Sequence, residues 1–334
     1  MFGMLHFYSK IGDSDRHYCY SLEGLNYIYN QIYHNQDSNF WQKVALYFSA
    51  KTNFSTVYFS SVSNMKQMFV QRAEILKIVL QNQNCTLNYS FPVRQPKQHR
   101  IRLGIIKEHF KENTETYASI PVFEYLDHDQ FEIFLYTLEN ANTPIEKYSQ
   151  SCADHFILLP QVLHEQAQTI RNDNLDILFF ATNLTASQNK ATTFLALHQL
   201  ARVQVASICS PVTSGMKTID YYIAGNLTAP IEELQSQYTE KLLNIEGSSL
   251  CFHFPVSNDS SQKKKRLRRH WQTSENTIVY ISGSNYHKII PEVRYTWAKI
   301  IAKTKNSILV LFPFNPVNPT TQLKLTYYFK LLYY

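Results

Sequence analysis

The sequence predicts an α/β protein with one complete doubly wound lobe, the beginning of a second lobe, and a helical region before both. Up to about residue 91, apolar residues recur at helical spacing. From Arg100, short apolar runs alternate with amphipathic segments, and a second such series begins at Thr277. Strands that alternate with helices in this way are typical of a mostly parallel sheet.

The N-terminal region, residues 1–97, is expected to be helical. One apolar stripe is preceded by Asn64 as a plausible helix cap, and it comprises Met65, Met68, Phe69, Leu76, Val79 and Leu80. The segments 25–32 and 41–48 suggest two more helices. These helices are either the remnant of a helical repeat array or a cap on the following domain. The cap is favoured, because no repeat of about 34 residues is found.

The first lobe is expected at residues 98–250, after a polar boundary that contains two prolines. Its strand candidates are Ile101–Ile106, Phe131–Leu138, His155–Leu159, Asp176–Thr182, Val203–Ile208 and Asp220–Ala224. The helix candidates between them are Pro121–Leu126, Val162–Arg171 and Thr192–Leu200. Ligands are expected at the carboxyl ends of these strands, since parallel sheets of this kind bind them there.

A basic linker or helix is expected at residues 251–275, before an incomplete second lobe at residues 276–334. Strand candidates Thr277–Ile281 and Ser307–Phe312 flank a helix near Pro291–Lys303. The net charge of +6 comes from six Lys and Arg residues within residues 263–269. A nucleic-acid-binding protein would spread its basic residues over a face, so no nucleic-acid partner is expected. The basic run is interpreted as a solvated helix between lobes, and the alternative is a phosphate-binding or membrane-surface segment.

Composition narrows the cellular setting. The chain has 334 residues, 44% of them hydrophobic, and no apolar run approaches the ~20 residues of a membrane span. The five cysteines are widely spaced, without the spacing of a zinc or redox motif. The N-terminus lacks the pattern of a signal peptide. We therefore expect a cytoplasmic protein with reduced thiols and no membrane span.

Two long blocks carry a family resemblance. The first is Pro211-Val-Thr-Ser-Gly-Met-Lys-Thr-Ile-Asp-Tyr-Tyr-Ile-Ala-Gly225, followed by Gln237-Tyr-Thr-Glu-Lys-Leu-Leu243. The second runs from Val279-Tyr-Ile-Ser-Gly-Ser-Asn-Tyr-His-Lys-Ile-Ile-Pro291 through Trp297–Ile301 to Asn306–Pro316. Together with Arg102–Phe110, they resemble the catalytic region of protein O-linked N-acetylglucosamine transferases in their SPINDLY-like form. Long blocks in matching order are more specific than a short motif.

The resemblance implies two Rossmann-like lobes in the GT-B glycosyltransferase architecture. It implies transfer of a sugar, with inversion, from UDP-GlcNAc or a related UDP-sugar to a Ser or Thr hydroxyl of a protein or peptide. The UDP-sugar is a substrate, and neither a cofactor nor a metal is expected. Such chemistry needs donors around the leaving diphosphate, an aligned hydroxyl and an acceptor for its proton.

On the donor side, the resemblance places Lys288 at the diphosphate and Asn285 near the uridine. An ammonium group that precedes a helix N-terminus suits a phosphate physically. We also expect Lys288 to follow the first strand of the second lobe and to face the cleft between the lobes. Alternatively, Lys288 is a solvent-exposed loop lysine.

On the acceptor side, the loop 107–117 should open into the cleft. Active relatives carry a histidine near the position of Asn113, and an amide cannot act as a base. His109 is close in sequence and is the other candidate, although a histidine here could equally make a structural hydrogen bond. Thr213, Ser214 and Gly215 match the loop that lines the acceptor and sugar side. They could also form a tight turn that caps the next helix.

The sequence departs from the family after the second block. The second lobe of this fold needs about six strands, whereas two strand candidates follow Thr277 before Pro316. We therefore expect a truncated and impaired glycosyltransferase, in which nucleotide binding and transfer by the chain alone fail. The alternatives are a non-catalytic acceptor-binding or scaffold remnant of the family, and a degenerate reading frame without function.

Overall fold

The computed structural model describes residues 7–61, 64–94, 99–185, 190–207, 209–227, 231–253, 271, 273–284 and 286–311. The described residues divide into two compact units. The first comprises 21–55 and the described residues between 62 and 254, and the second comprises 7–20, 56–61 and those beyond 255. The basic residues 263–269, candidate Asn285 and the segment after Leu311 lie outside the described residues. The domain boundaries expected from the sequence stay a prediction.

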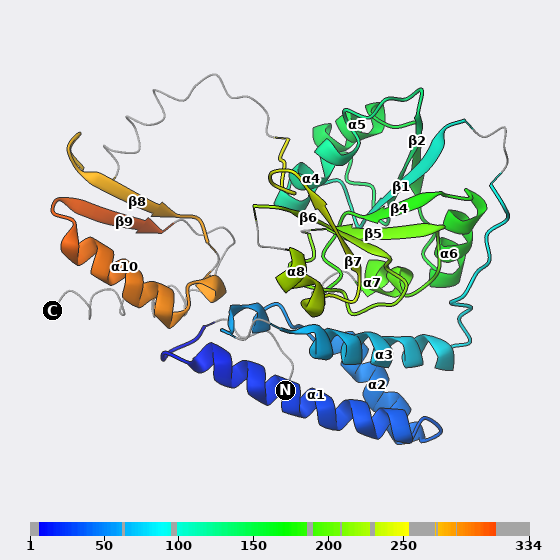
Figure 1. The fold of residues 1–334 in the computed structure, drawn as a ribbon, viewed down its shortest axis with the longest axis horizontal. Coiled ribbons are helices and arrows are strands. Elements are labelled where there is room, and N and C mark those ends of the chain that lie inside the picture. The colour runs from blue at the N-terminus through cyan, green and yellow to red at the C-terminus, as the bar shows by residue number, and fades with distance from the viewer. Residues whose placement is uncertain are drawn as a thin grey trace. The chain divides into compact units, whose positions relative to one another are not determined.

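A seven-stranded, entirely parallel sheet forms the centre of the first unit (Figure 1). Its strands are β1 (Ile101–Lys107), β2 (Phe131–Thr137), β3 (His155–Leu158), β4 (Ile177–Phe180), β5 (Val203–Ser207), β6 (Tyr221–Gly225) and β7 (Lys241–Ile245). The strand order is β3-β2-β1-β4-β5-β6-β7, and each neighbouring pair is parallel. The predicted α/β fold class and the six strands predicted for this lobe are confirmed.

Helices cover both faces of this sheet, as a parallel sheet requires. Helices α3 (Lys66–Asn82), α6 (Leu163–Asn172) and α7 (Lys190–Ala196) contribute to one apolar cluster against the strands. Helix α5 (Pro144–Ser151) and the 3₁₀ turn η2 (Ile120–Val122), which directly follows α4 (Thr114–Ser119), adjoin a second cluster. The remaining short helices of the unit are α8 (Ile231–Leu234) and η3 (Gln235–Gln237). The core therefore lies on both sides of the sheet.

The predicted helical region is present as α1 (Asp13–His34), α2 (Asn39–Lys51), the 3₁₀ turn η1 (Val57–Phe59) and α3. The prediction of Asn64 as the cap of α3 was wrong by one residue, because Met65 takes the N-cap position and makes no side-chain cap bond. Asn64 Oδ1 instead accepts a hydrogen bond from the Lys66 amide at 3.1 Å, one residue before the cap. Helix α3 is the most buried of the three, and its stripe packs on the sheet. The expectation of a helical cap on the following domain is thus supported for α3.

Three local predictions were wrong or incomplete. The helix expected at Pro121–Leu126 begins earlier, as α4, because the side chain of Asn113 caps it by accepting a hydrogen bond from Thr116. Helix α5 was not predicted, although Thr143 caps it and Pro144 stands at its first position. Strand β7 was also missed, because it lies at the sheet edge and only Leu242 is buried, so no apolar run marks it.

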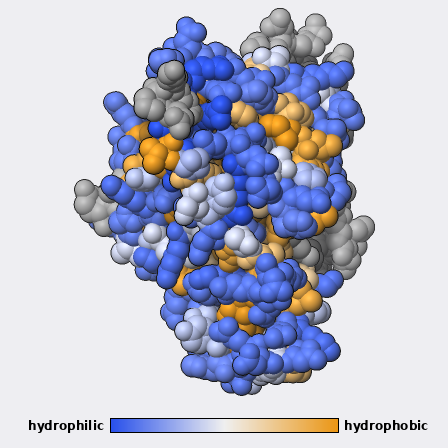
Figure 2. Space-filling view, turned by 90° about the vertical axis from the view of Figure 1, so that its right-hand side faces the viewer, coloured by the Kyte–Doolittle hydropathy of each residue, from blue (hydrophilic) through white to orange (hydrophobic). Residues whose placement is uncertain are grey.

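The surface carries exposed aromatic side chains on α1 and α2, including Tyr27, Phe40 and Tyr47. Figure 2 shows that hydrophilic residues cover most of the visible face and that hydrophobic residues form separate patches on it. Scattered apolar residues of this kind are normal on a folded domain. No helix in the described part of the chain combines the length and apolar character that a membrane span requires.

The second unit contains a β–α–β element and two segments from the N-terminal region. Strand β8 (Ile278–Ser282) leads through the 3₁₀ turn η4 (Tyr286–Lys288) into α10 (Pro291–Lys303), and β9 (Ser307–Leu311) pairs with β8 in parallel. The predicted strand–helix–strand series of the second lobe is therefore present. The segments 7–20 and 56–61 belong to the same compact unit.

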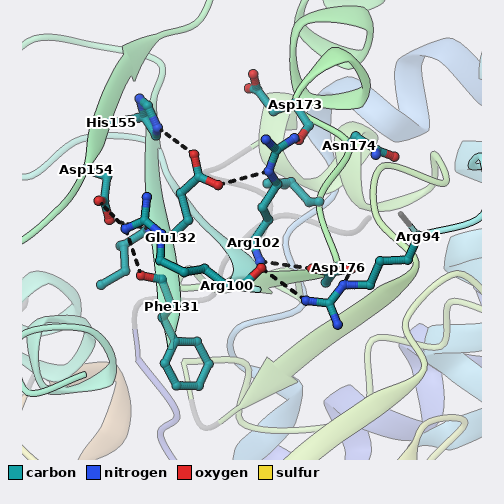
Figure 3. Close-up of polar contacts among 12 residues, drawn as sticks. Arg94, Arg100, Arg102, Phe131, Glu132, Asp154, His155, Asp173, Asn174 and Asp176 are labelled. Atoms are coloured by element: carbon teal, nitrogen blue, oxygen red, sulfur yellow. Dashed lines mark hydrogen bonds and ion pairs between the residues drawn. The ribbon is translucent and has the colours of Figure 1, made fainter. Parts of the chain in front are cut away.

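Charged side chains gather where the strands of the first unit begin (Figure 3). Arg102 pairs with Glu132 at 3.0 Å, and Arg100 pairs with Asp154 at 2.8 Å. The Asp154 carboxylate also accepts a hydrogen bond from the Ile133 amide at 2.9 Å. Each carboxylate thus joins neighbouring strands at the edge opposite the carboxyl ends. We interpret this network as structural, because ligands of parallel sheets bind at the other edge.

Asp154→Asn should lower the free energy of unfolding at pH 7 by about 2 kcal/mol, because charge-assisted hydrogen bonds are weakened. Burial opposes ionisation of Asp154, but the Ile133 amide and the Arg100 guanidinium outweigh it and lower its pKa. The stabilisation is therefore present above the unfolded-state pKa, ~3.9, and is lost as the pH falls through the lower folded-state value.

Urea denaturation followed by circular dichroism at pH 7 and at pH 3 measures this difference. The gap between wild type and Asp154→Asn should shrink at pH 3. Asp129→Asn is the control, because it removes an exposed carboxylate from the turn that precedes β2. It should change the free energy of unfolding by less than about 0.5 kcal/mol. A gap that is equal at both pH values would contradict the role of the ionised carboxylate.

Candidate functional site

The candidate ligand edge of the first unit is the end of the sheet where the strands have their carboxyl termini. The strand order places its centre between β1 and β4. The chain moves outward from β1 through β2 to β3, then returns to β4 and continues in the opposite direction to β7. The connections that follow β1 and β4 therefore leave the sheet to opposite sides. Such a reversal of strand order opens a crevice at the carboxyl ends of the strands, and ligands of doubly wound sheets bind there.

Lys107, the last residue of β1, is buried at this position. Its side chain is 2% exposed, its Nζ donates a hydrogen bond to the Ala181 carbonyl at 3.2 Å, and Glu115 Oε2 lies 4.0 Å away. Burial lowers the pKa of the Lys107 ammonium, and Glu115 opposes that shift. Burial likewise raises the pKa of the Cys209 thiol to about 11. This end of β1 therefore holds a lysine amino group with little access to solvent.

The loops after β4 and β5 are tied to each other and to α3. Ser210 Oγ accepts a hydrogen bond from the Leu184 amide at 3.0 Å. Arg72 of α3 donates to the Leu184 carbonyl, also at 3.0 Å. Within the β4 loop, Asn183 Oδ1 accepts from both the amide and the hydroxyl of Thr185, at 2.9 and 2.7 Å. These bonds hold the loops at the candidate ligand edge in one arrangement.

His109 lies two residues beyond β1 and is half-buried. Its Nδ1 accepts a long hydrogen bond, 3.4 Å, from the Lys111 amide. In the neutral ring that accepts through Nδ1, the proton is on Nε2. In that tautomer the Nδ1 lone pair is directed at the Lys111 backbone amide.

Asn113 has a structural contact in this unit. Its Oδ1 accepts a hydrogen bond from the Thr116 amide at 2.8 Å and so caps α4. An amide side chain also has no basic lone pair near neutral pH. Asn113 is therefore a helix cap here, and its predicted place in the catalytic site stays a prediction.

The loop Thr213–Gly215 is organised around a buried carboxylate that sequence reasoning did not single out. Thr213 and Ser214 are each 1% exposed, as is Glu240. Thr213 Oγ1 donates to Glu240 Oε2 at 2.6 Å, while the amide of Ser214 donates to Oε1 at 2.8 Å and its hydroxyl also donates to Oε1. Both hydroxyls thus face Glu240. The alternative of a tight turn that caps the next helix was wrong, because this segment leads into β6 and not into a helix. Contact with an acceptor stays a prediction.

Gly215 lies directly against helix α3. Its φ of +71° is in the left-handed region, and a Cβ at this position would lie 2.2 Å from the Phe69 carbonyl carbon. Any side chain would displace the α3 backbone at this point. Glycine is therefore required both by its own backbone conformation and by the packing of the helical region on the first unit.

The donor-side candidate lies in the second unit. Lys288 is exposed in the turn η4, immediately before the start of α10. It follows β8, as predicted, and precedes a 13-residue helix whose first-turn amides point toward this end. Its orientation toward a cleft between lobes stays a prediction, and its predicted neighbour Asn285 lies outside the described residues.

The first unit brings Lys107 next to the loop after β4, since its Nζ donates to the Ala181 carbonyl. Thr213–Gly215 instead pack against Glu240 and α3. Sequence reasoning did not assign a role to Lys107 or Glu240. A charged residue that ends a central apolar strand was the available signal for Lys107. Glu240 had no such signal, because its partners lie 26 and 27 residues away in the chain.

The sequence profile described as glycosyl transferase family 41 matches residues 49–251, which is more than half of the chain. This chain belongs to glycosyl transferase family 41. The matched residues include the ligand edge described above, from Lys107 through Glu240, together with α3. The family resemblance and fold class predicted from the sequence are thereby confirmed.

Named relatives agree with this assignment. A probable UDP-N-acetylglucosamine–peptide N-acetylglucosaminyltransferase SEC of Arabidopsis thaliana is 27% identical over 225 residues, which cover 64% of this chain and 22% of that protein. The similarly described SPINDLY protein of Oryza sativa subsp. japonica is 34% identical over 146 residues, covering 43% of this chain and 15% of the relative. This family 41 chain therefore spans about a fifth or less of the length of these relatives.

A solved structure supports the fold. A mutant O-GlcNAc transferase of Thermobaculum terrenum aligns with 91% of this chain and 54% of its own chain, with a TM-score of 0.63 and 20% sequence identity. At this identity the likeness concerns the fold alone, and it agrees with the GT-B class of the family 41 enzymes.

Gly215→Ala should destabilise the first unit by about 3 kcal/mol or more, because left-handed strain and overpacking against Phe69 act together. Gly247→Ala is the matched control, since Gly247 has a φ of +86° but no atom lies within 4 Å of the position that a Cβ would take. Gly247→Ala should lower the free energy of unfolding only by the left-handed backbone strain, about 1 kcal/mol. Urea denaturation measures both, and equal losses would contradict the close approach to α3.

Glu240→Gln should also destabilise the first unit, by about 1.5–3 kcal/mol, because an amide replaces a carboxylate that accepts three hydrogen bonds. Protection of the Ser214 and Gly215 amides from hydrogen exchange should fall in parallel. Glu233→Gln, in α8, changes the same group outside this cluster and serves as the control. Unchanged protection in Glu240→Gln would show that the carboxylate does not hold the loop.

Proposed function

We propose that this chain functions as a protein O-linked N-acetylglucosamine transferase of the SPINDLY-like type. The donor would be UDP-GlcNAc or a related UDP-sugar, and the acceptor a Ser or Thr hydroxyl of a protein or peptide. The observation that carries the proposal is the family 41 match over residues 49–251, which spans the ligand edge of the first unit. The descriptions of the relatives as N-acetylglucosaminyltransferases support the same reaction.

The roles of the two units follow from their chemistry. In this proposal, Lys288 and the first-turn amides of α10 neutralise the leaving diphosphate, as a cation and a helix N-terminus can. The loops after β1, β4 and β5 hold the acceptor and the sugar. Transfer would proceed without a metal ion, as the family resemblance implies.

A second function is favoured by one observation at the acceptor side. Asn113 caps α4 and has no basic lone pair, and His109 Nδ1 already accepts a hydrogen bond from the Lys111 amide at 3.4 Å. The family 41 chain could then bind an acceptor protein without glycosylating it. Binding of nucleotide and peptide without transfer of sugar would support this second function over the first.

The donor-side assignment predicts that Lys288→Ala weakens binding of uridine diphosphate by about 10- to 150-fold, the loss of one charge-assisted hydrogen bond of about 1.5–3 kcal/mol. Isothermal titration calorimetry on the full chain measures this, beside a transfer assay with UDP-GlcNAc and a Ser/Thr-rich peptide. Lys299→Ala is the matched control, because it removes an exposed lysine farther along α10.

Equal affinities of wild type and Lys288→Ala would remove Lys288 from the site. The absence of saturable binding by the wild-type chain would contradict the proposed function. That result would agree instead with the expectation from the sequence that the donor site is incomplete.

A further inference from the structure

The loop that carries Lys288 is anchored through the residue that follows it. Ile289 is 2% exposed and forms a small apolar cluster with Val293, Trp297, Leu311 and Phe7. Three of these partners belong to α10 or β9, but Phe7 comes from the N-terminal segment of the chain. The backbone of the loop is therefore held partly by residues that precede α1.

Arg294 connects the same elements through hydrogen bonds. It is 1% exposed, the largest side chain among the fully buried residues described. Its guanidinium donates to the Tyr8 carbonyl at 2.5 Å and, at 3.4 Å, to the carbonyls of Ser9 and Ile289. It also lies over the Phe7 ring, 4.4 Å from the ring centre. One buried cation thus joins the Lys288 loop to residues 7–9.

A second connection lies at the start of α10. Glu292 accepts a hydrogen bond from the Gly12 amide at 2.7 Å. Gly12 has a φ of +79°, which turns the chain just before α1 begins at Asp13. The two contacts, at Arg294 and at Glu292, therefore fix both ends of the short segment 8–12 against the first turn of α10.

The N-terminal segment is itself braced by residues 56–61. The Tyr8 hydroxyl donates to the Thr56 carbonyl at 3.0 Å. Asp15 accepts hydrogen bonds from the Ser60 hydroxyl at 2.9 Å and from the Ser61 amide at 2.6 Å. The ring of Phe59 contacts that of His287, the residue before Lys288, with 5.8 Å between centroids. The Lys288 turn is thus in contact with the N-terminal region through His287.

We infer that residues 7–12 are a positioning element for the donor-side loop, and that Arg294 is the positioning residue through which they act. The inference rests on the proposed function, in which Lys288 meets the diphosphate of a nucleotide sugar. Arg294 does not touch the ligand. It holds the backbone of Ile289, so that the neighbouring ammonium and the first amides of α10 keep one arrangement. Residues that precede α1 would then control donor affinity.

The test compares Arg294→Gln, Arg294→Lys and Phe7→Ala with the wild-type full chain. Hydrogen–deuterium exchange of the backbone amides of residues 286–290 reports the order of the loop, and titration with uridine diphosphate reports affinity. Arg171→Gln is the matched control. Arg171 is another buried arginine that donates to backbone carbonyls, those of Thr86, Leu87 and Gln199, but it belongs to the first unit.

Exchange in residues 286–290 should accelerate by about tenfold or more in Arg294→Gln. This factor corresponds to the stabilisation that is lost when a charged donor is removed from a buried carbonyl. Uridine diphosphate affinity should fall by a similar factor. Arg294→Lys should retain part of the exchange protection and part of the uridine diphosphate affinity. Phe7→Ala should accelerate exchange less strongly, because it removes a ring contact and leaves the hydrogen bonds of Arg294 in place. Arg171→Gln should leave exchange in this segment unchanged.

Unchanged exchange of residues 286–290 in both Arg294→Gln and Phe7→Ala would overturn the inference, whatever the nucleotide result. The inference would also be overturned if Arg294→Gln accelerated exchange in the loop but left uridine diphosphate affinity unchanged, while Lys288→Ala lowered that affinity. By contrast, equal affinities of wild type and Lys288→Ala would overturn the proposed function and leave the exchange result to decide the order of the loop.

Discussion

An all-parallel sheet is stable only when both of its faces are covered, and this constraint shapes the first unit. The helices that follow β1 and β2 cover one face, but the other also needs α3, which precedes the sheet in the chain. Its buried stripe supplies Ala73, Leu76 and Leu80 to the cluster around β4. The helical region is consequently part of the folded unit and shares its core.

The packing of α3 also determines the shape of the ligand edge. Arg72 reaches the Leu184 carbonyl in the loop after β4, and Gly215 approaches the α3 backbone so closely that no Cβ fits. Glu240 holds the residues before Gly215 from the opposite side of the loop. These anchors hold the loops in one arrangement.

The second unit, like the first, uses a buried arginine to hold a loop. There, too, a buried arginine bonds to backbone carbonyls of segments distant in the chain, with Arg294 joining α10 to residues 8 and 9. A guanidinium group suits this task, because its fixed fork of donors can serve several carbonyls at once. In both units, segments from the N-terminal region support loops that belong to the α/β core.

The sequence by itself determined the periodic features of this protein. The alternation of apolar runs predicted the strands β1 to β6, β8 and β9 and the helices α6 and α10. Two long blocks predicted the O-linked N-acetylglucosamine transferase family. Only the tertiary structure decided how the candidate residues are used. Asn113 caps α4, and Thr213 and Ser214 donate hydrogen bonds to Glu240. Arg294, to which the sequence assigned no role, donates to the Tyr8 carbonyl. The physical reason is that hydrophobic periodicity is local in the chain, whereas hydrogen bonds of buried polar groups depend on which distant segments the fold brings together.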